Sequence, residues 1–409
     1  MALLARMSSP NSASSSAARL KSARPRVAHV AHAPEFVQRI LLDEIRLLGD
    51  GLDITVVCSP GQGVDEVRAA GFRIITVPIQ RKIAPFRDMV ALWSLWRCLR
   101  REQFDVVHTH MPKAGLLGQL AAVLARVRVH LHTCHGFIYV PGMNPWLRRV
   151  MKITDSLTLR LAQRSLFVSN HDLKFAVREG FCSGINVRYV GGGIDLSRYA
   201  PRSPDVRMRL RRALGIPPNA FLILSVGRFV AEKGFRETAQ AARALLDRYP
   251  NLHFLWVAPV LGGEEGVLPH SLAADAGIAG AVTQLSQHDD MPAVYAAADL
   301  FVHPSYREGA SRVLMEAGAA GLPIIATDVA GCREVIPDDR YGRLVPARDP
   351  QALAAAISSC IEDPAGCRAR AREARLRVHA MFGADGCVSR VLAVYRELMP
   401  AWDVASSAT

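Results

Sequence analysis

The sequence contains no apolar run long enough to span a bilayer. Half of its 409 residues are hydrophobic, but charged residues interrupt the apolar runs well before the roughly 20 residues that a spanning helix needs. An organised signal peptide with an apolar centre is missing as well. We therefore expect no transmembrane segment.

The chain has few cysteines, and their spacing shows no paired motif. The eight cysteines stand at positions 58, 98, 134, 182, 332, 360, 367 and 387. No two have the Cys-x-x-Cys spacing of a zinc site, and the pattern differs from the disulfide framework of a small secreted domain. A reducing cytoplasm is the expected compartment.

Acidic residues are scarce in the first half of the chain. Residues 1–200 contain 27 Lys and Arg against 14 Asp and Glu, whereas residues 201–409 contain 23 of each, so the first half holds the whole net charge of +13. Such an excess favours an anionic partner, such as a membrane surface, a phosphorylated acceptor or a nucleic acid. Because no nucleic-acid-binding motif accompanies it, we expect no nucleic acid as a partner.

The length predicts two domains, because a single hydrophobic core stops growing well below 409 residues. Residues 1–24 are rich in Ser, Ala and Arg and contain no acidic residue. They are expected to form a disordered tail, although a transit peptide has a similar composition. We expect the two domains at 25–195 and 196–383, and in 384–409 a C-terminal helix that crosses back to the first domain, followed by a tail.

Short β-branched runs alternate with helical periodicity from residue 26 onward, which predicts an α/β protein with parallel sheets covered by helices. The strands are expected at 27–30, 54–58, 74–77, 106–109, 129–133, 166–169 and 187–190, then at 221–226, 252–257, 282–285, 300–303, 324–327 and 344–345. The helices are expected at 35–48, 86–102, 115–125, 145–163, 351–361, 366–379 and 384–398. Glycines at 191–193 and prolines at 201, 204, 217 and 218 predict a hinge between the domains.

A first motif with chemical potential follows the expected strand 221–226. Arg228 and Lys233 stand between the end of this strand and a helix that should start near Gly234. Arg228 can make forked hydrogen bonds to phosphate oxygens, Lys233 offers a mobile point charge, and the helix start adds unpaired N–H groups. The motif predicts phosphate binding, although an ordinary turn with surface cations has the same pattern.

A second motif follows the expected strand 300–303. If Ser311 is the N-cap of a helix, Glu308 in the loop and Glu316 in the first turns both face the strand ends. Gly309 and Ala310 are small enough for a diphosphate to approach the N–H groups of the helix start. Carboxylates there can accept hydrogen bonds from sugar hydroxyls. The alternative is a capping Glu308 and a solvated Glu316.

The two motifs together, followed by residues 321–328 and 331–335, resemble the donor site of glycosyltransferase family 4. The resemblance extends over nearly the whole chain after residue 25. Within the family, residues 81–102, 104–115 and 132–137 are most similar to bacterial enzymes that build surface polysaccharides. The resemblance implies the GT-B fold, in which two Rossmann-like domains with parallel sheets face each other across a cleft, and a retaining reaction.

The resemblance also implies roles for single residues. Arg228 and Lys233 would neutralise the donor diphosphate, Glu316 would hold the ribose, and Glu308 would contact the transferred sugar. His135 matches the family histidine near that sugar and the attacking hydroxyl. His108 and His110 are weaker candidates for the acceptor side.

The resemblance also implies that the loop of Gly309, Ala310 and Ser311 would lie against the donor diphosphate. Two departures from the family pattern concern donor contacts: residues 33–36 lack the Gly-Gly of many relatives, and residues 284–287 replace a common glycine-containing loop. No Asp-x-Asp motif stands where a diphosphate would lie, so we expect neither a metal nor another cofactor.

We therefore expect a glycosyltransferase that moves a sugar from a nucleotide-sugar donor to a glycan or polyprenyl-diphosphate-linked acceptor in bacterial polysaccharide synthesis. The 25–195 domain would bind the acceptor and the 196–383 domain the donor. Two alternatives stay open: a nucleotide-sugar epimerase of the same fold, and a non-catalytic relative that binds a membrane or polyanion. A basic aromatic face for anionic lipid is predicted from residues 145–152 with Trp93, Trp96, Arg97, Arg100 and Arg101. It would place the protein at the inner face of the plasma membrane. Helices packed on a sheet with solvated cations would have the same pattern.

Overall fold

The computed structural model describes residues 24–80, 83–137, 139, 143–260 and 266–400. The expected tail 1–24, apart from its last residue, therefore lies outside the described residues, as does the end of the segment 384–409. None of the eight cysteines is in a disulfide, and seven of them are buried. No helix in the described ranges combines the length and the apolar character that crossing a membrane would require.

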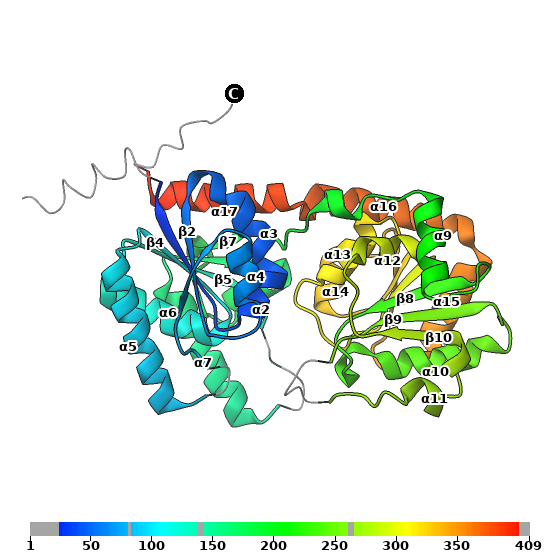
Figure 1. Ribbon diagram of the computed structural model, residues 1–409. Coiled ribbons are helices and arrows are strands. Elements are labelled where there is room, and N and C mark those ends of the chain that lie inside the picture. Colours follow the sequence, from blue (N-terminus) through cyan, green and yellow to red (C-terminus); the bar gives the residue numbers. More distant parts are fainter. Residues whose placement is uncertain (1–23, 81–82, 138, 140–142, 261–265, 401–409) are drawn as a thin grey trace, which may run out of the picture.

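The described chain contains two parallel sheets, which confirms the predicted α/β class (Figure 1). The first has the strand order β3-β2-β1-β4-β5-β6-β7 and the second the order β10-β9-β8-β11-β12-β13. The strands of the first sheet are β1 (Arg26–Val30), β2 (Asp53–Cys58), β3 (Arg73–Thr76), β4 (Val106–His110), β5 (Val129–Cys134), β6 (Arg164–Phe167) and β7 (Val187–Tyr189). The strands of the second sheet are β8 (Phe221–Val226), β9 (Leu252–Val257), β10 (Val282–Leu285), β11 (Leu300–His303), β12 (Ile324–Thr327) and β13 (Arg343–Val345).

Helices cover both faces of each sheet, as parallel strands require. In the first half these are α2 (Pro34–Phe36), α3 (Leu42–Leu48), α4 (Val64–Ala69), α5 (Pro85–Glu102), α6 (Pro112–Ala125), α7 (Pro145–Leu161) and α8 (Asn170–Arg178). The second half has α9 (Pro204–Ala213), α10 (Phe235–Leu246), α11 (Leu272–Asp275), α12 (Met291–Ala297), α13 (Arg312–Ala319), α14 (Ala330–Val335), α15 (Pro350–Glu362), α16 (Pro364–Phe382) and α17 (Ala384–Leu398). A π-helical turn, Val37–Leu41, joins α2 to α3.

The last helix packs on the first sheet rather than on the second. α17 runs along the top of the first domain in Figure 1, where it contacts α3. Val391 and Tyr395 of α17 belong to the same buried cluster as Val27 of β1. Arg390 fixes the helix by donating from Nε to the carbonyl of Val190, 2.8 Å away. The chain therefore crosses between the domains twice.

Each sheet has a switch in strand order at its centre, between β1 and β4 and between β8 and β11. In open α/β sheets, ligands bind beyond the carboxyl ends of the strands at such a point. Polar contacts connect the two domains on this side: the amide of Asn170, after β6, donates to Glu334 of α14 at 3.1 Å. The switch points therefore mark where a site between the domains is expected.

The predicted hinge contains more structure than the sequence pattern indicated. Leu196–Tyr199 forms a 3-10 turn, and α9 begins at Pro204, which occupies the first helical turn. Proline is well tolerated there because its missing N–H would have no partner in the helix. One of the clustered prolines therefore starts a helix rather than only interrupting structure.

Candidate active site

The two predicted phosphate-side motifs follow neighbouring strands. Gly227 and Arg228 come directly after β8, and the loop from Pro304 to Ser311 comes after β11, which lies beside β8. α10 begins at Phe235, with Gly234 at its N-cap in a left-handed conformation at φ 75°. A Cβ at Gly234 would overlap the carbonyl of Pro304. Only glycine therefore lets the first motif pack closely on the second.

Lys233 and Glu308 form an ion pair at the centre of the site. Nζ of Lys233 lies 2.6 Å from Oε1 of Glu308, and both side chains are largely buried. The same oxygen lies 2.7 Å from Nε2 of His303, the last residue of β11. Burial alone would raise the pKa of Glu308, but Lys233 and His303 together hold it well below its usual value. Glu308 is therefore an anion that can accept hydrogen bonds from a bound hydroxyl.

Arg228 forms an ion pair with Glu232. Its Nη2 is 2.9 Å from Oε1 of Glu232, whose other oxygen is 3.4 Å from Nη2 of Arg307. Glu232 thus holds two guanidinium groups near Lys233. These three cations stand between the end of β8 and the loop after β11, which is the position that the sequence predicted for phosphate-binding groups.

Glu316 is buried inside α13 and bonded at both oxygens. Tyr295 donates to Oε2 at 2.8 Å, and Nε of Arg312 donates to Oε1 at 3.2 Å. Arg312 also reaches Asp43 in the first domain, with 3.0 Å between Nη2 and Oδ2. The solvated alternative for Glu316 is therefore wrong. A carboxylate offers about four acceptor positions, so the two bonds leave capacity for a ligand hydroxyl.

Ser311 occupies the N-cap position of α13, as the sequence predicted, but its hydroxyl does not cap the helix. It lies 3.3 Å from Nε2 of His303 instead. The N–H groups of the first turn are therefore left without a side-chain cap. Gly309 and Ala310 precede this turn, and Gly331 packs so closely that a Cβ there would overlap the carbonyls of Glu308 and Gly309. The backbone of the loop is therefore fixed in place.

His135 of the first domain lies against this loop. It follows β5 directly, and a Cβ added to Gly309 would come within 2.9 Å of the His135 carbonyl oxygen. Phe36 of α2 packs edge-on against the imidazole, with ring centroids 4.9 Å apart. Burial lowers the pKa of His135 to about 4. The backbone of His135 thus meets the Glu308 loop of the other domain, and its neutral imidazole packs against Phe36 and His110 of its own domain.

His108 does not line the acceptor side, contrary to expectation. It is fully buried and bonds Tyr395 of α17 and Thr133 of β5, at 2.8 and 2.6 Å. His110 is also fully buried, and its Nδ1 lies 3.1 Å from Nε2 of His135. Among the described residues, one group of three potential metal ligands was found, His29, His108 and His110. Its member His110 hydrogen-bonds His135, whereas the residues predicted to bind the diphosphate belong to the second domain.

Several groups of the site were not predicted from the sequence. His303, Tyr295 and Glu232 contact predicted residues from other positions in the fold. Asp43 contacts Arg312, which in turn bonds Glu316. His303 alone had a detectable signal, because a polar residue at the end of a buried strand points to the ligand side of a parallel sheet.

Two family models match the chain. The model of "Glycosyl transferases group 1" covers residues 206–377, which include the Arg228, Lys233, Glu308 and Glu316 positions. The model of "Glycosyl transferase 4-like domain" covers residues 37–193, which include His135.

Curated relatives match most of the chain. One is the UDP-Gal:alpha-D-GlcNAc-diphosphoundecaprenol alpha-1,3-galactosyltransferase of Escherichia coli, 28% identical over 346 residues, 83% of this chain and 88% of the relative. Another is the D-inositol 3-phosphate glycosyltransferase of Streptomyces avermitilis, 31% identical over 363 residues, 85% of this chain and 76% of the relative.

The crystal structure of Anabaena Alr3699/HepE in complex with UDP-glucose superposes with a TM-score of 0.80 at 20% identity, over 91% of this chain and 99% of that one. This similarity confirms the GT-B arrangement of two Rossmann-like domains. The family matches and the relatives show that the chain is a glycosyltransferase and belongs to family 4, the group 1 glycosyl transferases.

Proposed function

We propose that the protein transfers a sugar from a uridine diphosphate donor to a lipid-linked acceptor, with retention of the anomeric configuration. The observation that carries the proposal is the meeting of Lys233 and Glu308 at 2.6 Å, with His135 of the opposite domain against Gly309. This arrangement offers a cation for the leaving diphosphate, an anion for the sugar hydroxyls and a neutral imidazole at the other side of the sugar.

The donor is proposed to lie along the second domain. Lys233 and Arg228 would bind the diphosphate oxygens, assisted by the uncapped N–H groups at the start of α13, and Glu316 would bind the ribose. Glu308 would bind the transferred sugar. Uridine diphosphate is favoured because the Escherichia coli relative is named for UDP-Gal and the Anabaena structure contains UDP-glucose.

Transfer with retention requires the acceptor hydroxyl to arrive on the face from which the diphosphate leaves. The C–O bond to the diphosphate breaks, and the new glycosidic bond forms through an oxocarbenium-like state. The proton of the attacking hydroxyl passes to the departing phosphate oxygen. Preorganised donors aimed at the developing negative charge are commonly worth a few kcal/mol each. Lys233, Arg228 and the start of α13 would supply this stabilisation.

A lipid-linked acceptor is proposed from the relatives and from the surface of the first domain. The Escherichia coli relative is named for a diphosphoundecaprenol acceptor. On this chain, large apolar side chains stand exposed at the first turns of α5 and on α7, among them Phe86 at 88% and Trp146 at 71% exposure. The helix α6 packs between α5 and α7, so the two sets lie on one side of the sheet.

Cations accompany this exposed apolar surface, which we call the basic aromatic face. Arg148 and Arg149 are exposed on α7, and Arg97 stacks over Trp93 with its Cζ 5.3 Å from the ring centroid. Trp96 is half-buried and contributes less than expected. Aromatic rings and cations on one surface suit an anionic bilayer. The face would hold the enzyme at the membrane surface on the cytoplasmic side, where polysaccharide precursors are assembled.

The experiment that tests the proposal measures products from a panel of uridine diphosphate sugars and a polyprenyl-diphosphate-linked acceptor. We expect one donor to give a glycosylated lipid, with the anomeric configuration of the donor shown by NMR coupling constants. Inversion would contradict the retaining mechanism. Conversion of the nucleotide sugar without transfer would support the epimerase alternative instead.

A further inference from the structure

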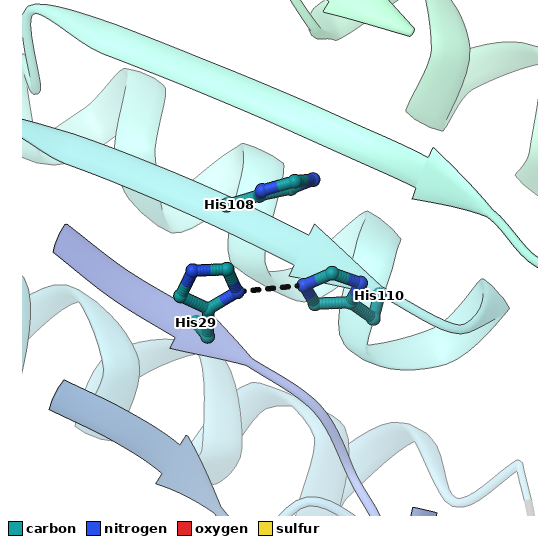
Figure 2. A group of neighbouring side chains, drawn as sticks. All are labelled: His29, His108 and His110. Atoms are coloured by element: carbon teal, nitrogen blue, oxygen red, sulfur yellow. Dashed lines mark hydrogen bonds between the residues drawn. The ribbon is translucent and has the colours of Figure 1, made fainter. Parts of the chain in front are cut away.

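A row of buried histidines connects the interior of the first domain to His135. His29 on β1 pairs in register with His108 on β4, and His110 lies two residues further along the same strand. Residues two apart on a strand share a face, so these three side chains lie on the face that is covered by α3 and α17. Figure 2 shows the rings of His29 and His110 directed toward each other.

The ring geometry suits hydrogen bonds better than metal coordination. One nitrogen from each of His29, His108 and His110 lies within 4.8 Å of the others. Tetrahedral ligands at about 2.0–2.1 Å from zinc would stand only about 3.4 Å apart. Moreover, the His108 ring stacks on His110, with centroids 4.5 Å apart, and both its nitrogens already bond Tyr395 and Thr133. The lone pair of His108 is therefore not directed to a common point with those of His29 and His110.

The hydrogen bonds form a continuous path of three rings. Nδ1 of His29 lies 3.0 Å from Nε2 of His110, and Nδ1 of His110 lies 3.1 Å from Nε2 of His135. Burial lowers the pKa of His29 to about 3 and of His135 to about 4, and lowers that of His110 well below its usual value. Each ring is therefore neutral and carries one proton.

One proton per ring allows only two arrangements, because His110 must donate on one side and accept on the other. In the first arrangement, His135 donates to His110 and His110 donates to His29. His29 would then hold its proton on Nε2, which is buried and has no hydrogen-bond partner in the described part of the chain. In the second, outward arrangement, His29 donates to His110 and His110 donates to His135, so Nε2 of His29 holds a lone pair. An orphaned buried N–H is rarer than an under-satisfied acceptor, so the outward arrangement is favoured.

We infer that His29 and His110 are positioning residues that hold His135 in the tautomer protonated at Nδ1, with Nε2 accepting from His110. Nδ1 of His135 makes no hydrogen bond to any residue that the structure describes, and the side chain is only partly buried. The row therefore presents an N–H donor at the end of β5, on the residue whose backbone contacts the Glu308 loop. A free imidazole in water prefers the other tautomer, so a fixed donor here needs a partner of this kind.

The consequence for catalysis rests on the proposed function, whereas the tautomer does not. A fixed Nδ1–H can donate to a hydroxyl of the transferred sugar or of the acceptor in every turnover. Losing the fixed orientation should lower kcat about tenfold to a hundredfold. KM for the nucleotide sugar should change less than kcat, because most of the proposed donor-binding groups lie in the other domain.

The test is long-range 1H–15N NMR of the imidazoles in 15N-histidine-labelled full-length protein, with His135 assigned by its loss in His135→Asn. We expect the wild type to show His135 protonated at Nδ1. In His110→Leu the N–H group that donates to His135 is lost. We therefore expect His135 to change to the Nε2–H tautomer and kcat to fall as stated above. The amide of His110→Asn can donate from a similar position and should restore both. His130→Asn, at a histidine on the opposite face that bonds Gln119, is the control and should change neither.

His135 protonated at Nε2 in the wild type would overturn the inference, and this measurement needs no variant to fold. An unchanged kcat in a His110→Leu protein whose His135 tautomer has changed would overturn the positioning role. Stoichiometric metal that is lost in His110→Leu would also overturn it, since coordination would occupy the ring nitrogens. A wild type with the expected tautomer but no transfer activity would refute the proposed function and leave the tautomer assignment standing.

Discussion

Lys233 and Glu308 lie 75 residues apart in the chain, yet their charged atoms are 2.6 Å apart. The pair is made by the protein's own groups, and His303 adds a second bond to the same carboxylate oxygen. Both groups are therefore oriented in advance. A bound donor would replace this ion pair with two contacts, one between its diphosphate and Lys233 and one between a sugar hydroxyl and Glu308.

Lys233→Ala should lower kcat/KM about a hundredfold or more, because it removes a cation that is aimed at the leaving diphosphate. It should also destabilise the fold by about 3 kcal/mol, since Glu308 stays buried and charged with only His303 beside it. Steady-state kinetics and urea unfolding measure the two effects.

Lys152→Ala is the matched control, because Lys152 forms an ion pair of the same 2.6 Å length with Glu179 outside the site. Donor hydrolysis in the absence of lipid should proceed at the wild-type rate in this control. A Lys233→Ala enzyme as active as the control would remove Lys233 from the mechanism.

Glu316→Gln should weaken binding of uridine diphosphate about tenfold, because a neutral amide is a poorer acceptor for ribose hydroxyls. Glutamine is preferable to alanine here, since alanine would leave the Tyr295 hydroxyl and the Arg312 guanidinium without their buried partner. Tyr295→Phe removes only the supporting hydroxyl and should weaken binding far less. Equal affinities of both variants in calorimetry would argue against a ribose contact.

Gly309→Ala should lower kcat about tenfold or more while the protein remains folded, because the new Cβ would come within 2.9 Å of the His135 carbonyl and push the two domains apart. Gly280→Ala is the control, since a Cβ at Gly280 meets nothing within 4 Å. Kinetics with saturating donor separates the two variants. If both retain full activity, the contact between His135 and Gly309 has no catalytic importance.

His29 should make stability depend on pH in the acidic range. Burial lowers its pKa from 6.5 to about 3, so between these values the unfolded chain holds a proton that the folded chain lacks. The free energy of unfolding therefore decreases as pH falls, by up to about 1.4 kcal/mol per pH unit for each such histidine. His29→Asn should make this decrease shallower by that amount between pH 6 and pH 4, as followed by urea unfolding. An unchanged slope would show that His29 is protonated in the folded state.

Reversal of two charges tests the basic aromatic face. Arg148→Glu with Arg149→Glu should abolish sedimentation with vesicles that contain anionic phospholipid, because each cation near such a surface contributes about 1 kcal/mol. Arg209→Glu with Arg212→Glu makes the same charge change on α9, where both arginines are exposed, and should leave sedimentation intact. Loss of binding in both doubles would indicate a net-charge effect rather than this face.

Most of the fold was predictable because parallel strands that are buried on both faces leave a strong pattern. Six expected strand ranges in the second half correspond to β8–β13, with a one-residue difference only at β13. α9 was missed, because Pro204 and four arginines interrupt the apolar periodicity on which helix prediction depends. The π-helical turn Val37–Leu41 was not predicted either, since its pattern differs little from that of an α-helix.

The site was predictable to a smaller extent, and for a physical reason. Arg228 and Glu308 follow strands, Lys233 precedes a helix, and Glu316 lies in the first turns of one, so a local pattern makes them candidates. The link from His29 to His110 depends on the register between β1 and β4, which no local pattern contains. The Tyr295 bond to Glu316 likewise requires knowing that α12 packs beside α13. Contacts that depend on tertiary packing were therefore the ones missed.

The central claim is that Lys233 and Arg228 bind the diphosphate of the donor. Calorimetric titration of uridine diphosphate into the Arg228→Ala, Lys233→Ala double variant tests it most directly, with Arg209→Ala, Arg212→Ala as the matched double. The account predicts that the site variant loses about a hundredfold or more in affinity while the matched double binds as the wild type does. Wild-type affinity in the site variant would contradict it.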